Sequence, residues 1–237
     1  TLLMLVAWLW LASASGIRLR MTPRVALIFF LLGLLTVFLV PLIYYSYGIQ
    51  SVEHVRLFTW LMAYGGSLAS LPLGLAIWHG LLYGGDTPVA ARALRAALIT
   101  SVVLFGIGGG IGFLIQGSNV TIPAHYHGSI VAVTLAFMGL TYHLLPRLGF
   151  GEPQPGMAHA QPYVYAVGQL LHILGLVWSG GYGVQRKVAG GEQILDSLGQ
   201  KAGMGLMGIG GLVAVIGGFM FLLIVLRALF KRAEGAG

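Results

Sequence analysis

Two histidines at the start of a long apolar run are the residues of this sequence whose type and spacing best suit chemistry. His125 and His127 lie in the segment IPAHYHGS, residues 122–129, and the run that it opens ends at Leu145. Side chains at positions i and i+2 of a helix point about 200° apart. The two imidazoles therefore cannot bind one metal ion from the same helix, but they can serve two cofactors, one on each side of it.

Imidazole is the commonest biological metal ligand near neutral pH, which makes a pair of haem cofactors the chemistry that this spacing favours. The alternative is that His125 and His127 are polar side chains at the mouth of a membrane helix.

The composition is that of an integral membrane protein. Hydrophobic residues make up 57% of the 237 residues and charged residues 8%, and the mean hydropathy is +0.89. Soluble domains carry about 25% charged residues. The chain contains no cysteine, so disulfides, iron–sulfur clusters, thiolate ligands and covalently attached haem are excluded. Any metal must be held by other side chains or by a cofactor's own atoms.

Apolar runs divide the chain into candidate membrane spans. They are Thr1–Ala14, Val25–Tyr45, Leu57–Leu82, Ala93–Ile115, Ala124–Leu145, Tyr163–Val184 and Gly203–Phe230. All but the first are long enough to cross a bilayer as helices, and helices satisfy their own backbone groups in lipid. We expect an all-α, polytopic helical bundle with six full spans and one partial N-terminal span, the remainder of a longer helix, and a single transmembrane domain over residues 1–237.

The basic residues predict the orientation of the spans. The net charge of +7 does not indicate nucleic acid, because in a membrane protein the placement of Lys and Arg is what matters. One set of ends holds Arg18, Arg20, Arg24, Arg92, Arg95, Arg147, Arg227, Lys231 and Arg232, and the other holds Arg56, Arg186, Lys187 and Lys201. We place the richer set in the cytoplasm. His125, His127, Arg186 and Lys187 are then expected near the outer face.

A glycine-rich run, residues 106–112, lies inside the span that precedes the two histidines. It lacks the spacing of a nucleotide-binding loop and no strand precedes it. Gly108 and Gly112 are four residues apart, which permits close approach of a neighbouring helix or of a cofactor.

The stretch Ala97–Phe150 resembles the ninth and tenth helices of subunit I of the haem–copper oxidases, a superfamily that includes the nitric oxide reductases. The resemblance rests on the glycine-rich helix, the Ala-His-Tyr-His motif at residues 124–127, and the turn YHLLPR at residues 142–147. It implies that His125 binds a high-spin haem and His127 a low-spin haem.

Two further segments fit the same resemblance, which covers residues 24–237 and the last six helices of the family. The segments LPLG, residues 71–74, and WHG, residues 78–80, resemble its eighth helix. The segment GVQRK, residues 183–187, resembles the outer basic pair that binds haem propionates. Arg186 and Lys187 suit that role, because guanidinium and ammonium groups bind carboxylates strongly.

The copper site of the family is where this sequence departs from the resemblance. Members carry an adjacent His-His pair in the seventh helix, and the corresponding region here, residues 42–47, reads LIYYSY. We therefore do not expect copper, and paired-metal reduction of oxygen or nitric oxide is not indicated.

The remaining histidines have less specific surroundings. His172 lies in mid-span near Gln169, where a bond to glutamine or a backbone carbonyl competes with a ligand role. His54 could be a second axial ligand or an interfacial partner of Glu53. His79 and His143 lie near cytoplasmic helix ends, and we place His159 in a loop.

The sequence thus favours a membrane haem protein of the bacterial or archaeal inner membrane. It would relay electrons through one or two non-covalent haems, b-type or a-type, within a respiratory complex of other membrane subunits, with cytochrome c or quinol as electron donor. Two alternatives stay open: a catalytic terminal oxidase or nitric oxide reductase subunit completed by another chain, and a haem-free structural subunit.

Overall fold

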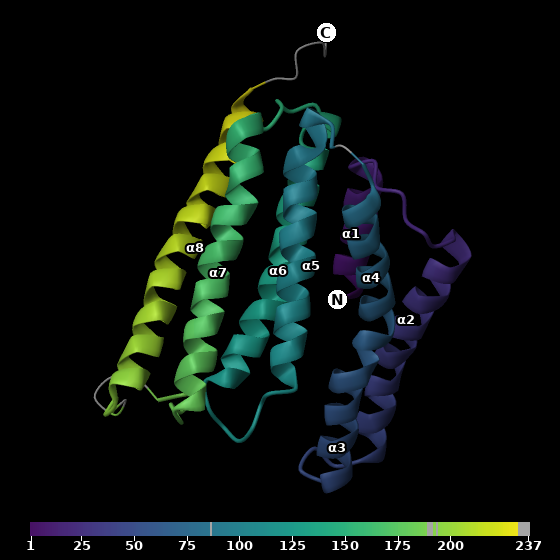
Figure 1. The fold of residues 1–237 in the computed structure, drawn as a ribbon. Helices are drawn as coiled ribbons and strands as arrows, with labels where there is room; N and C mark the ends of the chain where they lie inside the picture. The colour runs from purple at the N-terminus through teal and green to yellow at the C-terminus, as the bar shows by residue number, and fades with distance from the viewer. Residues whose placement is uncertain (86, 189–191, 193, 232–237) are drawn as a thin grey trace. The chain divides into compact units, whose positions relative to one another are not determined.

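The chain is all-α in the part that the computed structural model describes, which is residues 1–85, 87–188, 192 and 194–231 (Figure 1). Its helices are α1 (Leu2–Ala14), α2 (Pro23–Ser46), α3 (Val52–Trp60), α4 (Ser67–Tyr83), α5 (Arg92–Gly112), α6 (Thr121–Leu144), α7 (Pro155–Gly181) and α8 (Leu198–Phe230). A π-helical turn, Leu61–Gly65, joins α3 to α4.

Six helical segments are long and apolar enough to cross a membrane. The second of these, Val52–Tyr83, consists of α3, the π-helical turn and α4 together. The shorter α1 is the partial span that the first apolar run predicts. The expected all-α architecture of six full spans and one partial span is confirmed, and the chain is an integral, multi-pass membrane protein.

The helices group into two compact units, Thr1–Asp86 and Thr87–Gly237. The first contains α1 to α4, and the second contains α5 to α8 and both histidines of the Ala-His-Tyr-His motif. The single transmembrane domain expected over residues 1–237 stays a prediction.

Small residues bring the helices of the first unit into contact. A Cβ atom on Gly33 of α2 would lie 2.9 Å from the Ala69 Cβ of α4 and 3.1 Å from a methyl of Leu2. On α4, Gly74 faces the indole of Trp8, which is almost fully buried. Helices α1, α2 and α4 therefore pack closely around one another, with small residues at the points of contact.

In the second unit, α5 and α6 run antiparallel and touch through glycine. A Cβ atom on Gly108 would lie 2.6 Å from the carbonyl carbon of Gly128, so the two backbones are in direct contact there. About two helical turns before Gly108, the Ser101 hydroxyl of α5 donates to the Ala132 carbonyl of α6 at 2.5 Å. The glycine-rich run of α5 thus serves helix packing, one of the two roles that its spacing indicates.

Helices α7 and α8 form the closest antiparallel pair of this unit (Figure 1). A Cβ on Gly175 of α7 would lie 2.3 Å from the Met207 backbone nitrogen, and one on Gly210 of α8 would lie 2.2 Å from the His172 backbone nitrogen. The contact positions of α8 recur every seven residues, at Gly203, Gly210 and Gly217. A seven-residue repeat keeps one stripe of a helix facing its partner, as in a coiled coil.

A buried amide connects three helices of the second unit near their other end. The Tyr142 hydroxyl of α6 donates to the Gln161 Oε1 of α7 at 2.9 Å. The Gln161 Nε2 in turn donates to the Gly217 carbonyl of α8 at 3.1 Å. The side chain of Gln161 is fully buried, and these bonds satisfy it where no water is available.

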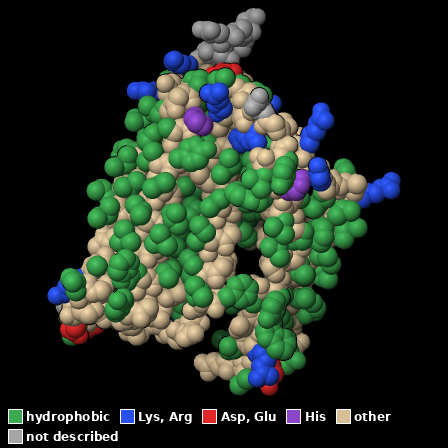
Figure 2. All heavy atoms as spheres, viewed as in Figure 1, with side chains coloured by type: hydrophobic (Ala, Val, Ile, Leu, Met, Phe, Trp, Pro, Cys, Tyr) green, Lys and Arg blue, Asp and Glu red, His purple; other side chains and the backbone are tan. Residues whose placement is uncertain are grey.

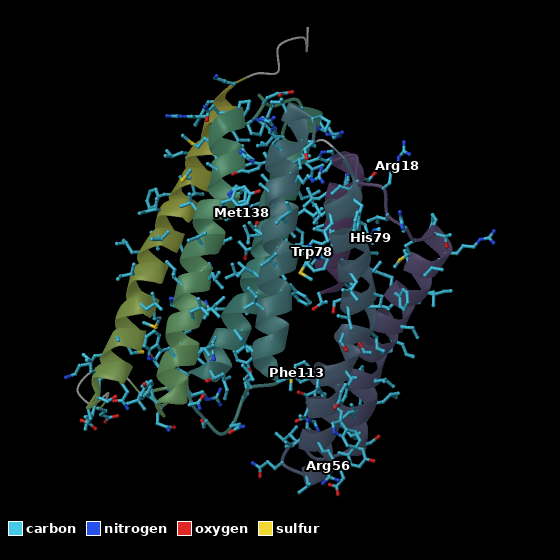
Figure 3. The ribbon with its side chains drawn as sticks, in the orientation of Figure 1. Arg18, Arg56, Trp78, His79, Phe113 and Met138 are labelled. Carbon is cyan, nitrogen blue, oxygen red and sulfur yellow. The ribbon has the colours of Figure 1, made fainter. Side chains whose placement is uncertain are left out.

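The charged residues lie at the helix ends, while hydrophobic side chains cover the long faces (Figure 2). In the second unit α5 begins, and α6 and α8 end, on one side, so Arg92, Arg95, Arg147, Arg227 and Lys231 gather there. In the first unit Arg56 lies at the opposite end from Arg18 and His79 (Figure 3). The two sets of basic residues are therefore separated within each unit as predicted; Arg232 lies outside the described residues.

Replacement of Gly210 by alanine tests the contact between α7 and α8. We expect Gly210→Ala to lower the midpoint of thermal unfolding by roughly 2–10 °C, because the added methyl meets the His172 backbone and overpacking costs about 1–3 kcal/mol. The measurement is unfolding of the detergent-purified protein followed by circular dichroism.

Gly218→Ala is the matched control on the same helix, since nothing lies within 4 Å of its Cβ position. Alanine favours helix over glycine, so this variant should be as stable as the parent or more stable. Equal destabilisation by both variants would contradict the proposed α7–α8 contact.

Candidate cofactor site

Both histidines of the motif lie in the second turn of α6, just after its start. The helix begins at Thr121, whose backbone N–H donates to the Asn119 side-chain oxygen at 3.0 Å. Proline at position 123 suits a first helical turn, where a missing N–H costs nothing. The connection between α5 and α6 therefore ends at Thr121, and the first turns of α6 hold His125 and His127 near one end of the second unit.

The His125 ring faces α5. Its Nδ1 lies 2.7 Å from the Gly108 carbonyl oxygen. A Cβ atom on Gly112 would lie 3.0 Å from the ring, so glycine at that position provides the space in which the imidazole sits. In the part of the chain that the structure describes, the Nε2 of His125 has no hydrogen-bond partner.

The His127 ring faces α7 instead. Its centroid lies 4.6 Å from that of the His172 ring, with 57° between the two planes. The side chain is largely exposed. The prediction that the two histidines of the motif point to different sides of their helix is therefore confirmed, whereas their role as haem ligands stays a prediction.

His172 is held in place from α8. Its Nδ1 lies 3.0 Å from the Met207 carbonyl oxygen, which confirms the expected bond to a backbone carbonyl. One turn earlier on α7, the buried Gln169 Oε1 has no hydrogen-bond partner among the described residues. The contact of His172 with His127 was not predicted from the sequence; the available signal was a second ionisable side chain inside a span.

The basic pair lies at the same end of this unit as the two histidines. Its loop is bonded to the segment that leads into α6: the Val120 N–H donates to the Val184 carbonyl at 3.0 Å, and Asn119 and Gln185 form an antiparallel bridge. The Arg186 Nε donates to the Ser118 hydroxyl at 3.2 Å.

Lys187 follows with a left-handed backbone, φ 62°, which is uncommon for a residue other than glycine. Both side chains of the pair are at least partly exposed. No described carboxylate forms an ion pair with either of them. The pair therefore presents two positive charges at the end of the unit where the two histidines lie, and no carboxylate in the described part of the chain neutralises them.

The other histidines have ordinary local partners. His54 is buried in the first unit, where its Nδ1 lies 3.3 Å from the Tyr47 carbonyl and its ring stacks on Phe58; the expected pairing with Glu53 is not what holds it. His143 bonds to Arg147 one turn away. His159 lies in α7 and not in a loop, because the helix already begins at Pro155.

Among the described residues, no group of three or more His, Asp or Glu side chains could hold a metal ion by itself. A site that offers one or two imidazoles suits a metal that brings its other ligands with it. Haem iron is such a metal, because the porphyrin supplies four nitrogen donors and the protein only the axial ones.

Comparison with known proteins gives relatives but no function. No family model matches the sequence. An uncharacterized protein of Rickettsia prowazekii is 38% identical over 148 residues, which cover 58% of this chain and 28% of that protein. An uncharacterized protein of Aquifex aeolicus is 36% identical over 76 residues, 30% of this chain and 20% of the relative. The chain therefore spans less than a third of the length of these curated relatives.

Cysteine labelling tests which side of the membrane the site faces. The chain has no cysteine, so an introduced thiol reports only its own position. The ends that are rich in basic residues are predicted to face the cytoplasm, and Lys187 lies at the opposite ends. We therefore expect Lys187→Cys to react with a membrane-impermeant maleimide added to intact cells. Glu152→Cys, in the loop between α6 and α7, should react only after the cells are opened. The reverse pattern would contradict the predicted orientation.

Proposed function

We propose that this chain is a haem-binding membrane subunit of a bacterial or archaeal respiratory complex, similar to the C-terminal half of haem–copper oxidase subunit I. The observation that carries the proposal is the arrangement at one end of the second unit. His125 and His127 of α6 face different neighbouring helices there, and a basic loop that forms no ion pair with a described carboxylate is bonded to the segment that precedes them.

The surroundings of His125 fit an axial ligand. Metal-binding histidines usually give one ring nitrogen to a backbone carbonyl or carboxylate, which fixes the tautomer and aims the other nitrogen at the metal. The contact between the Nδ1 of His125 and the Gly108 carbonyl has this form. It leaves Nε2 as the nitrogen that would bind iron.

His127 fits a ligand of a second haem, with His172 as the residue that positions it. The ring of His172 is fixed through its Nδ1 by the Met207 carbonyl, so it limits the orientations that the neighbouring His127 ring adopts. The exposure of His127 leaves it accessible to a large planar cofactor.

Arg186 and Lys187 fit the binding of haem propionates. Propionates are anions at the membrane edge, and charge-assisted bonds from a guanidinium are among the stronger hydrogen bonds in proteins. The bonds from their loop to residues 118–120 keep these charges at the histidine end.

A bound haem would supply one-electron oxidation and reduction of its iron. The part of this chain would be to hold the iron through imidazole, keep it in a low-dielectric helical environment and neutralise the propionates. Electrons would come from cytochrome c or quinol and pass to other membrane subunits of the complex.

A catalytic role is the second candidate, and one observation favours it. Among the described residues, His127 and His172 face each other on a different side of α6 from His125, so neither is placed to bind the same iron as His125. A haem on His125 would then keep an open coordination position. A terminal oxidase or nitric oxide reductase subunit would need further metal ligands from another chain.

Alanine variants of the histidines test the proposal through haem content. In the purified parent protein we expect one or two haems per chain by pyridine haemochromogen extraction. His125→Ala and His127→Ala should each abolish one site, because each removes a protein bond to iron. His159→Ala is the matched control, since this exposed histidine lies in the first turns of α7, where α6 ends.

Loss of haem in both motif variants, with the control unchanged, supports the proposal. A folded parent protein without haem would contradict it and leave a structural membrane subunit. Equal haem in all four proteins would place the cofactor elsewhere in the chain.

Replacement of Arg186 by glutamine tests the binding of propionates. The variant loses a charge-assisted bond of about 1.5–3 kcal/mol, so haem transfer to excess apomyoglobin should be about 10- to 100-fold faster than from the parent. Lys201→Gln, which removes a positive charge from the same end near the start of α8, should leave the rate within twofold. Similar rates of haem transfer for all three proteins would contradict a role for Arg186 in binding the propionates.

A further inference from the structure

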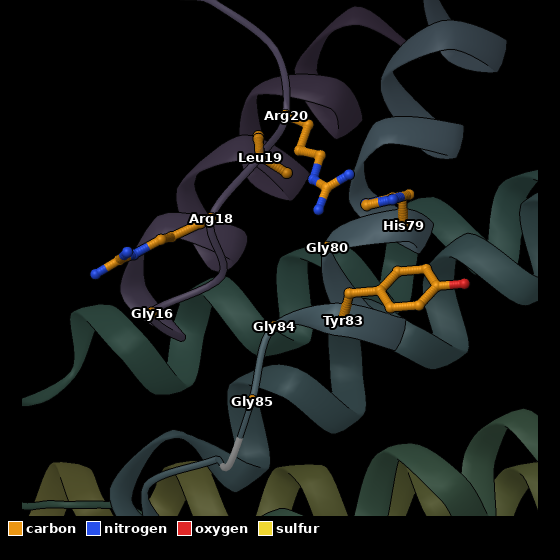
Figure 4. A pocket seen from close by; sticks show the side chains of 9 residues that line it. All are labelled: Gly16, Arg18, Leu19, Arg20, His79, Gly80, Tyr83, Gly84 and Gly85. Carbon is orange, nitrogen blue, oxygen red and sulfur yellow. The ribbon is translucent and has the colours of Figure 1, made fainter.

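A cavity of about 620 Å³ opens in the first unit (Figure 4). Pockets that hold small ligands are usually roughly 300–1,000 Å³. It lies between the connection from α1 to α2 and the C-terminal end of α4, and it is lined by Gly16, Arg18, Leu19, Arg20, His79, Gly80, Tyr83, Gly84 and Gly85.

Glycines give the cavity its shape. Gly16 ends α1 with a left-handed backbone, φ 71°, and the Ile17 N–H donates back to the Ala12 carbonyl at 2.9 Å. This Schellman arrangement turns the chain sharply. The turned segment then lies against α4, because a Cβ on Gly80 would be 2.6 Å from Ile17. The turn and the contact together bring Arg18 and Arg20 to the end of α4.

Among the described residues, the lining of the cavity carries two arginines and no acidic side chain. No described carboxylate forms an ion pair with Arg18 or Arg20. The Arg20 side chain points toward His79, whereas Arg18 extends away from the cavity (Figure 4). The His79 ring packs on Tyr83, with 4.6 Å between centroids. The Arg20 guanidinium and the His79 imidazole thus lie beside one space, and both groups can donate to an anion.

Exposed apolar side chains form a stripe on another face of α4. Leu71, Leu75, Trp78 and Leu82 are all exposed, and their spacing of four, three and four residues places them on one face. The region of α4 thus combines a basic cavity at its C-terminal end with exposed apolar side chains along the part that spans the membrane.

We propose that this cavity binds the phosphate headgroup of an anionic phospholipid whose acyl chains lie in the surrounding bilayer. Basic pockets at the cytoplasmic edge of membrane helices recognise such headgroups, and this end of the first unit carries Arg18, Arg20 and Arg24, the residues expected in the cytoplasm. A soluble phosphate compound shares the headgroup chemistry, but it lacks the acyl chains that hold a phospholipid at the membrane edge, where the C-terminal end of α4 lies. Arg20 holds the phosphate, and Arg18 adds charge from the rim.

Native mass spectrometry of the purified full chain in detergent tests the site. Phosphatidylglycerol, phosphatidylcholine and inorganic pyrophosphate are added separately, and the bound fraction is measured. We expect phosphatidylglycerol to bind at least fivefold more tightly than phosphatidylcholine. Arg20→Ala should weaken the binding of phosphatidylglycerol about fivefold, because a basic residue near an anionic membrane surface contributes about 1 kcal/mol. Arg18→Ala should have a smaller effect.

Two variants separate a specific site from general charge and from misfolding. Arg24→Ala removes a cation from the same end that does not line the cavity, so it should bind like the parent. Arg20→Lys keeps the charge and should restore at least half of the lost affinity. Equal loss in Arg20→Ala and Arg24→Ala would overturn the proposal. Binding of pyrophosphate without preference for phosphatidylglycerol would also overturn it, in favour of a soluble phosphate ligand.

Discussion

Direct contact between helix backbones at glycine is the interaction on which the second unit depends. In lipid, apolar side chains gain little by leaving the solvent, so helices associate through close packing at small residues. Here Gly108 touches Gly128, and Gly175 and Gly210 touch the backbone of the opposite helix. These contacts fix the registers that set His125 against the Gly108 carbonyl and His172 beside His127. A larger residue at any of them would move the histidine end as well as the helices.

Much of the architecture can be read from the sequence because the membrane leaves few choices. Apolar runs of sufficient length must be helices, and their ends are marked by charge. The opposite directions of His125 and His127 follow from helical geometry alone. The loop assigned to His159 was wrong for a local reason: Gln154 caps the Met157 N–H and Pro155 occupies the first turn, so residues that resemble a turn begin a helix.

Contacts between distant segments could not be predicted in the same way. The approach of His172 to His127 depends on the register of α6 against α7, which no single segment specifies. The seven-residue recurrence of Gly203, Gly210 and Gly217 was a usable signal for the face of α8 that meets α7. The cationic cavity depends on one left-handed glycine and on the contact of Gly80 with a residue more than 60 positions earlier. Charge patterning predicted the end on which Arg20 lies, but not its neighbours.

The central claim is that imidazole at the start of α6 binds haem iron, and a reduced-minus-oxidised absorption spectrum of the purified native protein tests it most directly. The account predicts sharp b-type or a-type bands, unchanged by carbon monoxide where the iron carries two protein ligands. A carbon monoxide-sensitive component would show an open coordination position and favour the catalytic candidate over electron relay. A featureless difference spectrum from a protein with intact helical circular dichroism would contradict the claim.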